Sequence, residues 1–272
     1  NVPGVDVIVT GHAHQGTDRA LVSNGTIIVS TNATSTELGK LQINYDTDKQ
    51  RIVSHSNQLI TIYDDEVEDD ADMLMEITYW QKEVDRIASI PVASSTKKLV
   101  RAYGKESNMG NLFTDAIAAF DERIDIAVMN SGGLRQDIDL GEITKGDLIS
   151  AFPFPNTIVM TKLKGFQLKK IFDHAAGMTN GILQVSQNVK YSFSPKNKVI
   201  EIWIKGELIN DNQDYWVAAP NFVTQGGDGY SEFQNSIEYI DSGVLIIDQV
   251  ENYLKERKLY EPKYEGRVQV IE

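Results

Sequence analysis

The sequence predicts a mixed α/β protein (α+β), with β-rich segments first and alternating helices and strands after them. Three observations carry this prediction: short runs of β-branched residues bounded by turn residues, an apolar stripe at helical spacing near residue 80, and alternating apolar segments beyond residue 90. The chain has 272 residues, which is enough for one large domain or two modest domains with buried cores.

The first 62 residues are predicted to be mainly β-structure. The apolar run Val5–Thr10 precedes a polar loop, and turn residues separate the runs that follow. β-branched residues are enriched in all of these runs, which favours strands. The later runs cover residues 26–31, 38–45 and 52–62.

An amphipathic helix is predicted after the acidic stretch 64–72. Apolar residues recur there at spacings of four, three, four and three, which places them on one helix face. Acidic residues in the first turn complement the helix dipole. We expect the helix to end near Pro91, with a domain boundary there or at the helix start. The stripe consists of Met73, Ile77, Trp80, Val84 and Ile87.

The rest of the chain is predicted to alternate helices with strands. We expect helices over residues 111–120, 166–176 and 244–255. We expect strands over residues 125–130, 157–163, 190–193, 199–205 and 215–219.

Composition excludes several classes of protein. With 26 basic and 39 acidic residues the net charge is −13, so neither a nucleic acid polymer nor an anionic membrane is an expected partner. The absence of cysteine excludes disulfides, thiolate zinc sites and cysteine nucleophiles. No apolar run is long enough to predict a transmembrane segment. The chain begins at Asn1 and enters a strand almost at once, so we expect it to be the middle and end of a longer protein.

Two of the four histidines, His12 and His14, directly follow the first predicted strand. Loops at the carboxyl ends of strands commonly hold ligands in α/β proteins, and imidazole is a common metal ligand. The alternative is a pair of exposed loop histidines. The pattern Gly-His-x-His alone leaves both interpretations open.

The run Asn130–Arg135 takes a predicted strand through two glycines to an arginine. Glycines allow a close approach of the backbone to a ligand, and a guanidinium can bind a carboxylate or phosphate through two hydrogen bonds. The alternative is a tight turn with a solvated arginine.

Two loop phenylalanines, Phe154 beside prolines and Phe222 before a glycine-rich segment, are candidates for a stacking surface. Stacking of a base on such a ring contributes roughly 1 to 3 kcal/mol. Packing in the core is the alternative for each ring. Asp228, which lies between two glycines, either accepts hydrogen bonds from a sugar diol or caps a turn.

In order and spacing, these segments together resemble the 5′-nucleotidase family, and the resemblance covers nearly the whole chain. The segments that carry it are Gly11–His14, Asn108–Leu112 with Asp115, Asn130–Arg135, Gly141–Thr144 with Gly146–Leu148, Phe152–Thr157 and Asn221–Tyr230. The resemblance implies a calcineurin-like metallophosphoesterase domain with two divalent metal ions, zinc, manganese or similar, and a C-terminal domain that binds the nucleoside. By resemblance, residues 1–63 are the C-terminal remnant of the metal domain, 64–89 a linker helix and 90–272 the substrate-binding domain.

The resemblance also implies roles for individual residues. Phe154 and Phe222 match the pair that sandwiches the base. Asp228 matches the acidic residue that binds the ribose hydroxyls. Arg135 matches an arginine close to the phosphate or sugar, and Asn130 lies near the base.

One position departs from the family pattern. Some relatives carry an arginine at or near the Met-Gly step, where this chain has Asn108 and Asn111. We include Asn108 among the predicted substrate-binding residues, with the phosphate type left open. His12 and His14 match the last metal-ligand motif of the family.

The other metal-ligand motifs of the family, and its catalytic histidine, have no match in this sequence. We therefore expect this stretch of chain not to hold the metal pair alone and not to hydrolyse AMP at an appreciable rate. Metal-dependent phosphate release from AMP would contradict this expectation.

For the whole protein, the resemblance implies metal-dependent release of phosphate from nucleoside 5′-monophosphates, with export to the periplasm, cell wall or medium. Two alternatives in the same family are a 2′,3′-cyclic-nucleotide phosphodiesterase with 3′-nucleotidase activity and a UDP-sugar hydrolase. A non-catalytic module that binds nucleosides or a surface partner is the alternative from another class. In each catalytic case the expected partner is a small nucleotide or nucleoside.

Overall fold

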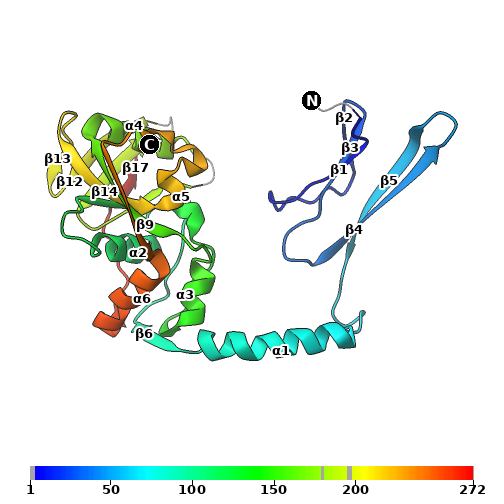
Figure 1. Cartoon of the computed structure of the whole chain (residues 1–272), viewed down its shortest axis with the longest axis horizontal. Helices are drawn as coiled ribbons and strands as arrows, with labels where there is room; N and C mark the ends of the chain where they lie inside the picture. The colour runs from blue at the N-terminus through cyan, green and yellow to red at the C-terminus, as the bar shows by residue number, and fades with distance from the viewer. Residues whose placement is uncertain (1–3, 179–180, 195–197, 272) are drawn as a thin grey trace. The chain divides into compact units, whose positions relative to one another are not determined.

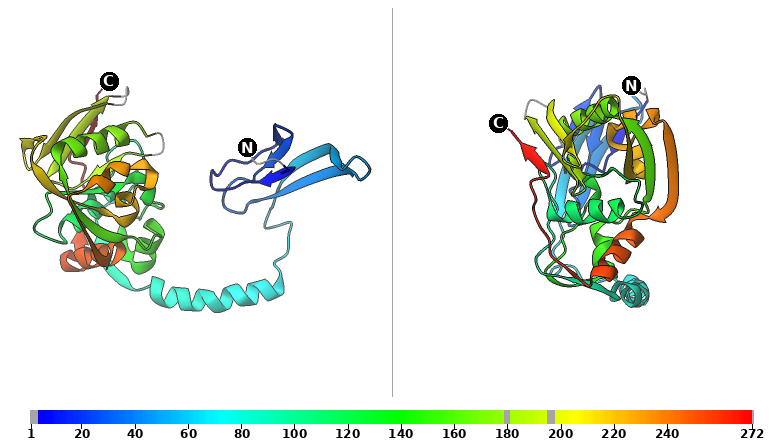
Figure 2. Two further views of the ribbon diagram at one scale, coloured as in Figure 1. Left: turned by 45° about the horizontal axis from the view of Figure 1, so that its top comes forward. Right: turned by 90° about the vertical axis from the view of Figure 1, so that its left-hand side faces the viewer.

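The computed structural model describes residues 4–178, 181–194 and 198–271. The chain divides into two compact units, unit 1 (Asn1–Tyr79) and unit 2 (Trp80–Glu272). The division falls within helix α1 (Ala71–Ala88), which Figures 1 and 2 show as one continuous helix. The domain limits drawn from the family resemblance stay a prediction.

The strands of unit 1 form two small sheets. They are β1 (Val7–Val9), β2 (Leu21–Ser23), β3 (Thr26–Val29), β4 (Glu37–Asp46) and β5 (Arg51–Thr61). β3 pairs parallel with β1 and antiparallel with β2, whereas β4 and β5 form a long hairpin. The four predicted strands are confirmed, and β2 is an addition. Ile27 and Val29 of β3 are buried, whereas the side chains of β4 and β5 are half-buried or exposed.

The predicted amphipathic helix is confirmed as α1. It begins after Asp70, whose carboxylate accepts a hydrogen bond of 2.9 Å from the backbone N–H of Met73 and so caps the first turn. None of its residues is buried, and the whole apolar stripe is exposed.

Unit 2 contains five further α-helices among its described residues. They are α2 (Asn108–Ala118), α3 (Lys145–Ala151), α4 (Gly165–Ala176), α5 (Asn221–Thr224) and α6 (Ile246–Arg257). The three predicted helices are confirmed as α2, α4 and α6. α2 begins three residues earlier than predicted, because the hydroxyl of Ser107 accepts a hydrogen bond from the N–H of Gly110. Short α3 was not predicted, although Thr144 and Asp147 form a capping box at its start.

Among the described residues of unit 2, the strands form three sheets. Their bounds are β6 (Pro91–Ser95), β7 (Ile126–Asn130), β8 (Gly141–Thr144), β9 (Thr157–Lys164), β10 (Leu183–Val185), β11 (Val189–Ser194), β12 (Lys198–Ile204), β13 (Glu207–Leu208), β14 (Asp214–Pro220), β15 (Glu238–Leu245), β16 (Leu259–Tyr260) and β17 (Val268–Val270). The central sheet has the order β10-β7-β14-β9-β15, and the others have the orders β13-β12-β11-β17 and β16-β6-β8. All five predicted strands of this part are confirmed, as β7, β9, β11, β12 and β14.

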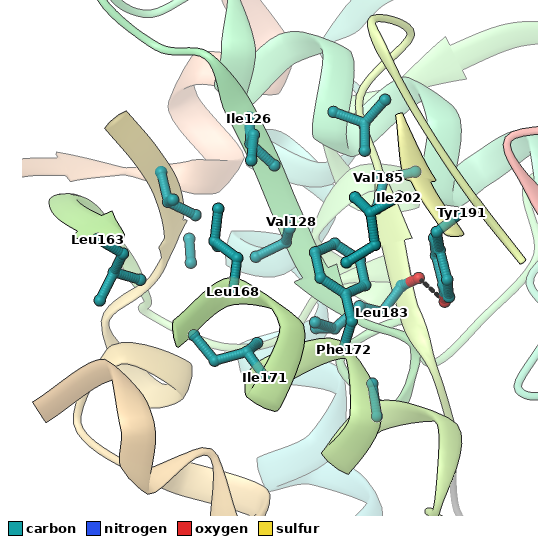
Figure 3. Packing of buried hydrophobic residues seen from close by; sticks show 14 of the residues in the cluster. Ile126, Val128, Leu163, Leu168, Ile171, Phe172, Leu183, Val185, Tyr191 and Ile202 are labelled. Carbon is teal, nitrogen blue, oxygen red and sulfur yellow. Dashed lines mark hydrogen bonds between the residues drawn. The ribbon is translucent and has the colours of Figure 1, made fainter. Parts of the chain in front are cut away.

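The central strand β7 has all five residues buried, and its side chains alternate between two cores. Ile126 and Val128 pack with α4 and the β11–β12 ribbon, whereas Ala127 and Met129 pack with α2 and α6. Figure 3 shows the first core, where side chains of α4 point toward Ile126 and Val128. Because both faces of the sheet are covered, the ends of the strands are where this sheet is open to ligands.

A buried ion-pair network fastens the last strand to α2. Arg267 is 3% exposed and donates two hydrogen bonds, of 2.7 and 2.8 Å, to the carboxylate of Asp115. It also donates to Glu265, and Glu106 accepts from its backbone N–H. Burial alone would lower the pKa of Arg267, but the hydrogen bonds and charges of Asp115 and Glu265 raise it, so the guanidinium stays charged. Asp115, which belongs to one of the motifs of the family resemblance, therefore has a structural partner.

Candidate functional site

One end of the central sheet gathers most of the predicted substrate residues. β7 and β14 run parallel, so Asn130 at the end of β7 lies at the same sheet edge as the carboxyl end of β14. β9 runs antiparallel to β14 and pairs Ile158 with Pro220, so β9 begins at this edge. Phe222 comes two residues after Pro220, and Phe154 comes shortly before β9. The sheet register therefore brings together segments that are far apart in the chain.

Asn130 and Asp228 meet directly at this edge. The side-chain amide of Asn130 donates a hydrogen bond of 2.9 Å to Oδ2 of Asp228, although the two residues are 98 positions apart. Asn130 is buried and Asp228 is half-buried, so the carboxylate faces solvent from a fixed position. Its other oxygen, Oδ1, accepts no hydrogen bond from the described part of the chain and is available to a hydroxyl donor.

Asp228 has a left-handed backbone conformation, with φ 53° and ψ 20°, inside a short 3₁₀ turn (Gly227–Gly229). Asp adopts this conformation more readily than most residues other than glycine. The turn follows α5, and Gly226 and Gly229 on either side have φ of 92° and 82°. The glycines thus let the chain turn tightly enough to present one carboxylate at the sheet edge.

The ring of Phe222 lies flat on Gly227. A Cβ atom on Gly227 would lie 2.6 Å from both Cε1 and Cε2 of this ring, so only glycine leaves room for it. The side chain is still 42% exposed, because its remaining surface points to solvent. A ring supported on one side and open on the other is suited to stacking against a planar ligand.

Phe154 continues an aromatic series that begins in the core. Its ring packs edge-on against Phe152, with centroids 5.7 Å apart, and Phe152 packs in turn against Phe113. The guanidinium of Arg135 lies over the Phe154 ring, 5.4 Å from its centroid. Within the described residues no carboxylate pairs with Arg135, so the exposed guanidinium is available to an anion.

Comparison with known proteins shows the family of this chain. A family model described as "5′-nucleotidase, C-terminal domain" matches residues 86–235, more than half of the chain. The chain belongs to the 5′-nucleotidase family. It is 29% identical to the trifunctional nucleotide phosphoesterase protein YfkN of Bacillus subtilis and 28% identical to human 5′-nucleotidase, matches that cover 99% and 98% of this chain. It spans only 20% of the former protein and 55% of the latter.

Two solved structures share the fold of this 5′-nucleotidase family member. A 5′-nucleotidase precursor from Thermus thermophilus has a TM-score of 0.78 at 24% identity, and the match covers 98% of this chain and 60% of that one. A putative 5′-nucleotidase from Staphylococcus aureus has a TM-score of 0.76 at 16% identity, with coverage of 97% and 56%. At these identities the matches show the fold alone.

Asn108 differs from the other predicted substrate residues, because its side-chain amide is bonded to backbone groups. Its amide is buried, accepts a hydrogen bond of 2.7 Å from the N–H of Val100 and donates one of 2.9 Å to the carbonyl of Lys98. Both ends of the amide are thus used by the backbone. We therefore leave Asn108 out of the proposed site and assign it to the attachment of the segment before α2.

Two side chains near the site were not predicted. His174, at the end of α4, contacts the carbonyl of Asp228, and Arg101 lies beside the loop that carries Arg135 through its contacts with Asp137. Arg101 also donates to the hydroxyl of Tyr103 at 2.7 Å. No local pattern marks either residue, because the contacts bridge 54 and 36 positions of the chain.

The two metal-ligand candidates are exposed and adjacent in unit 1. His12 and His14 both have left-handed backbones, with φ of 69° and 55°. No group of three or more His, Cys, Asp or Glu side chains in the described residues is arranged to hold a metal ion. A dinuclear centre needs more ligands than two imidazoles, so the residues present do not fit the metal pair that the family resemblance implies.

No helix formed by the described residues combines the length and apolar character needed to cross a bilayer.

Proposed function

We propose that unit 2 binds the nucleoside part of a nucleotide, and that the whole protein releases phosphate from nucleoside 5′-monophosphates. The observation that carries the proposal is the Asn130–Asp228 hydrogen bond, which fixes a half-buried carboxylate beside Gly227, the residue against which the exposed ring of Phe222 lies. Membership of the 5′-nucleotidase family supports the class of substrate.

In this proposal the base stacks on aromatic rings. Phe222 offers a flat surface supported by Gly227, and Phe154 offers a second ring held by the core aromatic series. Stacking on each ring contributes roughly 1 to 3 kcal/mol, whichever base is bound, because every base has a π-face. The pair therefore explains affinity for a nucleoside without fixing which base is preferred.

The sugar is held by Asp228. Its free Oδ1 accepts hydrogen bonds from the ribose hydroxyls, while Asn130 holds Oδ2 and keeps the carboxylate from turning away. A charged acceptor favours a sugar that carries the hydroxyls, because hydrogen bonds to a charged group are stronger than those between neutral groups.

Arg135 is placed to attract the phosphate. Its guanidinium is exposed and lies 5.4 Å from the centroid of the Phe154 ring, so it can bind an anionic group of a nucleotide held near that ring. The net charge of −13 makes this local cation more important, because the chain as a whole repels anions.

The hydrolytic step is proposed for the whole protein, since it needs groups beyond the residues of unit 2. His12 and His14 are proposed as two ligands of a metal pair, zinc, manganese or similar, whose other ligands this sequence does not supply. Bound in the whole protein, such a pair would supply a Lewis acid for hydrolysis. Export to the periplasm, cell wall or medium likewise stays a prediction.

Calorimetric titration of the 272-residue chain with adenosine and with uridine, without added metal, tests the proposed site. Saturable binding of either nucleoside is expected, because the carboxylate and the rings are already in place. A folded chain that binds neither nucleoside would refute the assignment of these residues.

A further inference from the structure

His174 contacts the turn that carries Asp228. Its Nε2 lies 2.8 Å from the carbonyl oxygen of Asp228. A carbonyl oxygen only accepts hydrogen bonds, so the imidazole must donate from Nε2.

The imidazole ring of His174 also packs against one side of the turn that carries Asp228. It packs edge-on against Tyr230, with ring centroids 4.8 Å apart and an interplanar angle of 82°. A Cβ atom on Gly229 would lie 2.9 Å from its Cε1, so the ring touches the backbone of the turn. Tyr230 is buried in the core that contains α4, which anchors this contact to the body of unit 2.

Two separate contacts therefore hold Asp228, one at its side chain and one at its backbone. Asn130 binds the carboxylate, and His174 binds the backbone carbonyl. The backbone of Asp228 is left-handed, a conformation sparsely populated by residues other than glycine, so contacts with its neighbours help to maintain it. The turn also has backbone hydrogen bonds of its own, from the N–H of Gly229 to Gly226 and from the N–H of Tyr230 to Gly227. The imidazole adds a restraint on the direction of the Asp228 carbonyl to the one that Asn130 places on the carboxylate.

We propose that His174 is a positioning residue that sets the sugar selectivity of the site, by holding Asp228 in the orientation that accepts the ribose diol. The proposal rests on the proposed nucleoside site. His174 does not itself bind the ligand through Nε2, because the carbonyl of Asp228 occupies that atom. The imidazole of His174 is not one of the rings proposed to stack on the base, which are those of Phe154 and Phe222.

The test compares adenosine with 2′,3′-dideoxyadenosine, which lacks the diol, by calorimetric titration of the 272-residue chain. His174→Phe keeps a ring against Tyr230 and Gly229 but cannot donate. We expect it to weaken adenosine binding by roughly tenfold, the loss of about one hydrogen bond to a charged group, and to leave dideoxyadenosine binding unchanged. His174→Gln, which places an amide donor near the same position, should keep most of the selectivity.

Lys170→Ala is the matched control. Lys170 lies one turn earlier on α4 and pairs with Glu232 just after the turn, but it does not contact Asp228. Its loss should change neither affinity. Circular dichroism of each variant shows whether the helix and the sheet remain folded.

Three outcomes would overturn the proposal. Unchanged selectivity in His174→Phe would show that Asp228 needs no such support. Equal weakening of both ligands would show that His174 supports the whole turn and not the carboxylate in particular. If the unmodified chain binds neither ligand, the nucleoside site itself is wrong, and the assignment of His174 is rejected with it.

Discussion

Replacing Phe222 by alanine separates a binding role from a packing role for this ring. The side chain is 42% exposed, so the truncation removes only part of a buried Phe contact. Full burial of such a side chain contributes about 1.5 to 3 kcal/mol, and a little over half of that gives a loss of about 1 to 2 kcal/mol in the free energy of unfolding. Stacking on a base contributes roughly 1 to 3 kcal/mol, which corresponds to an increase of about five- to 150-fold in Kd.

Phe166→Ala is a matched control for this variant. Phe166 is 43% exposed, which matches the exposure of Phe222. It lies just after the end of β9, whereas the proposed site lies near the start of that strand. Both variants should lose similar stability in thermal unfolding. Only Phe222→Ala should lose adenosine affinity in the calorimetric titration.

Two results would refute this reasoning. If Phe222→Ala lowers stability by about 3 to 5 kcal/mol, the cost of truncating a fully buried Phe, the ring belongs to the core. If both variants bind adenosine as tightly as the unmodified chain, the base does not stack on Phe222.

Further predictions concern the support of the site and of the fold. Gly227→Ala should displace both the ring and the backbone carbonyl of Phe222, which would lie 2.6 and 2.5 Å from the added Cβ, and should weaken adenosine binding in calorimetric titration. Because the contact with the carbonyl remains in Phe222→Ala, the double variant should be less stable than Phe222→Ala alone. Glu251 is buried, which raises its pKa, but hydrogen bonds from two lysines lower it by more, so the net shift is downward. Its carboxylate therefore stabilises the fold above the unfolded pKa of about 4.5 and loses this effect as the pH falls through the lower folded pKa. Glu251→Gln should lower Tm near neutral pH, and the difference in Tm from the unmodified chain should shrink below about pH 4. Arg267→Met should cost about 3 to 5 kcal/mol in chemical denaturation, because Asp115 is left charged without its partner, and a loss below about 1 kcal/mol would contradict this account.

Secondary structure was predictable where a local pattern was strong. The 3.6-residue period of α1 and the β-branched runs of β3, β4 and β5 appear in the sequence itself, because each depends on neighbours within a few positions. Short elements such as α3 and β2 were missed, since a few residues carry too little periodicity to stand out.

The residues of the candidate site were likewise predictable only in part. Sequence alone selected Phe154, Phe222 and Asp228, because an aromatic or acidic residue beside or close to proline or glycine already restricts what a loop can do. It could not distinguish a stacking ring from a core ring, since that depends on what covers the ring in space. For the same reason it included Asn108, whose buried amide is used by backbone groups eight and ten positions away.

The sequence by itself determined the class of the fold, the order of its main elements and the chemical types gathered in the site. Tertiary structure decided which of these groups meet: the register of β9 on β14 brings two loops to one edge, Asn130 reaches Asp228 across 98 positions, and His174 reaches it across 54. The physical reason is that a hydrogen bond is fixed by distance and direction in space. Local periodicity carries no information about partners so far apart along the chain.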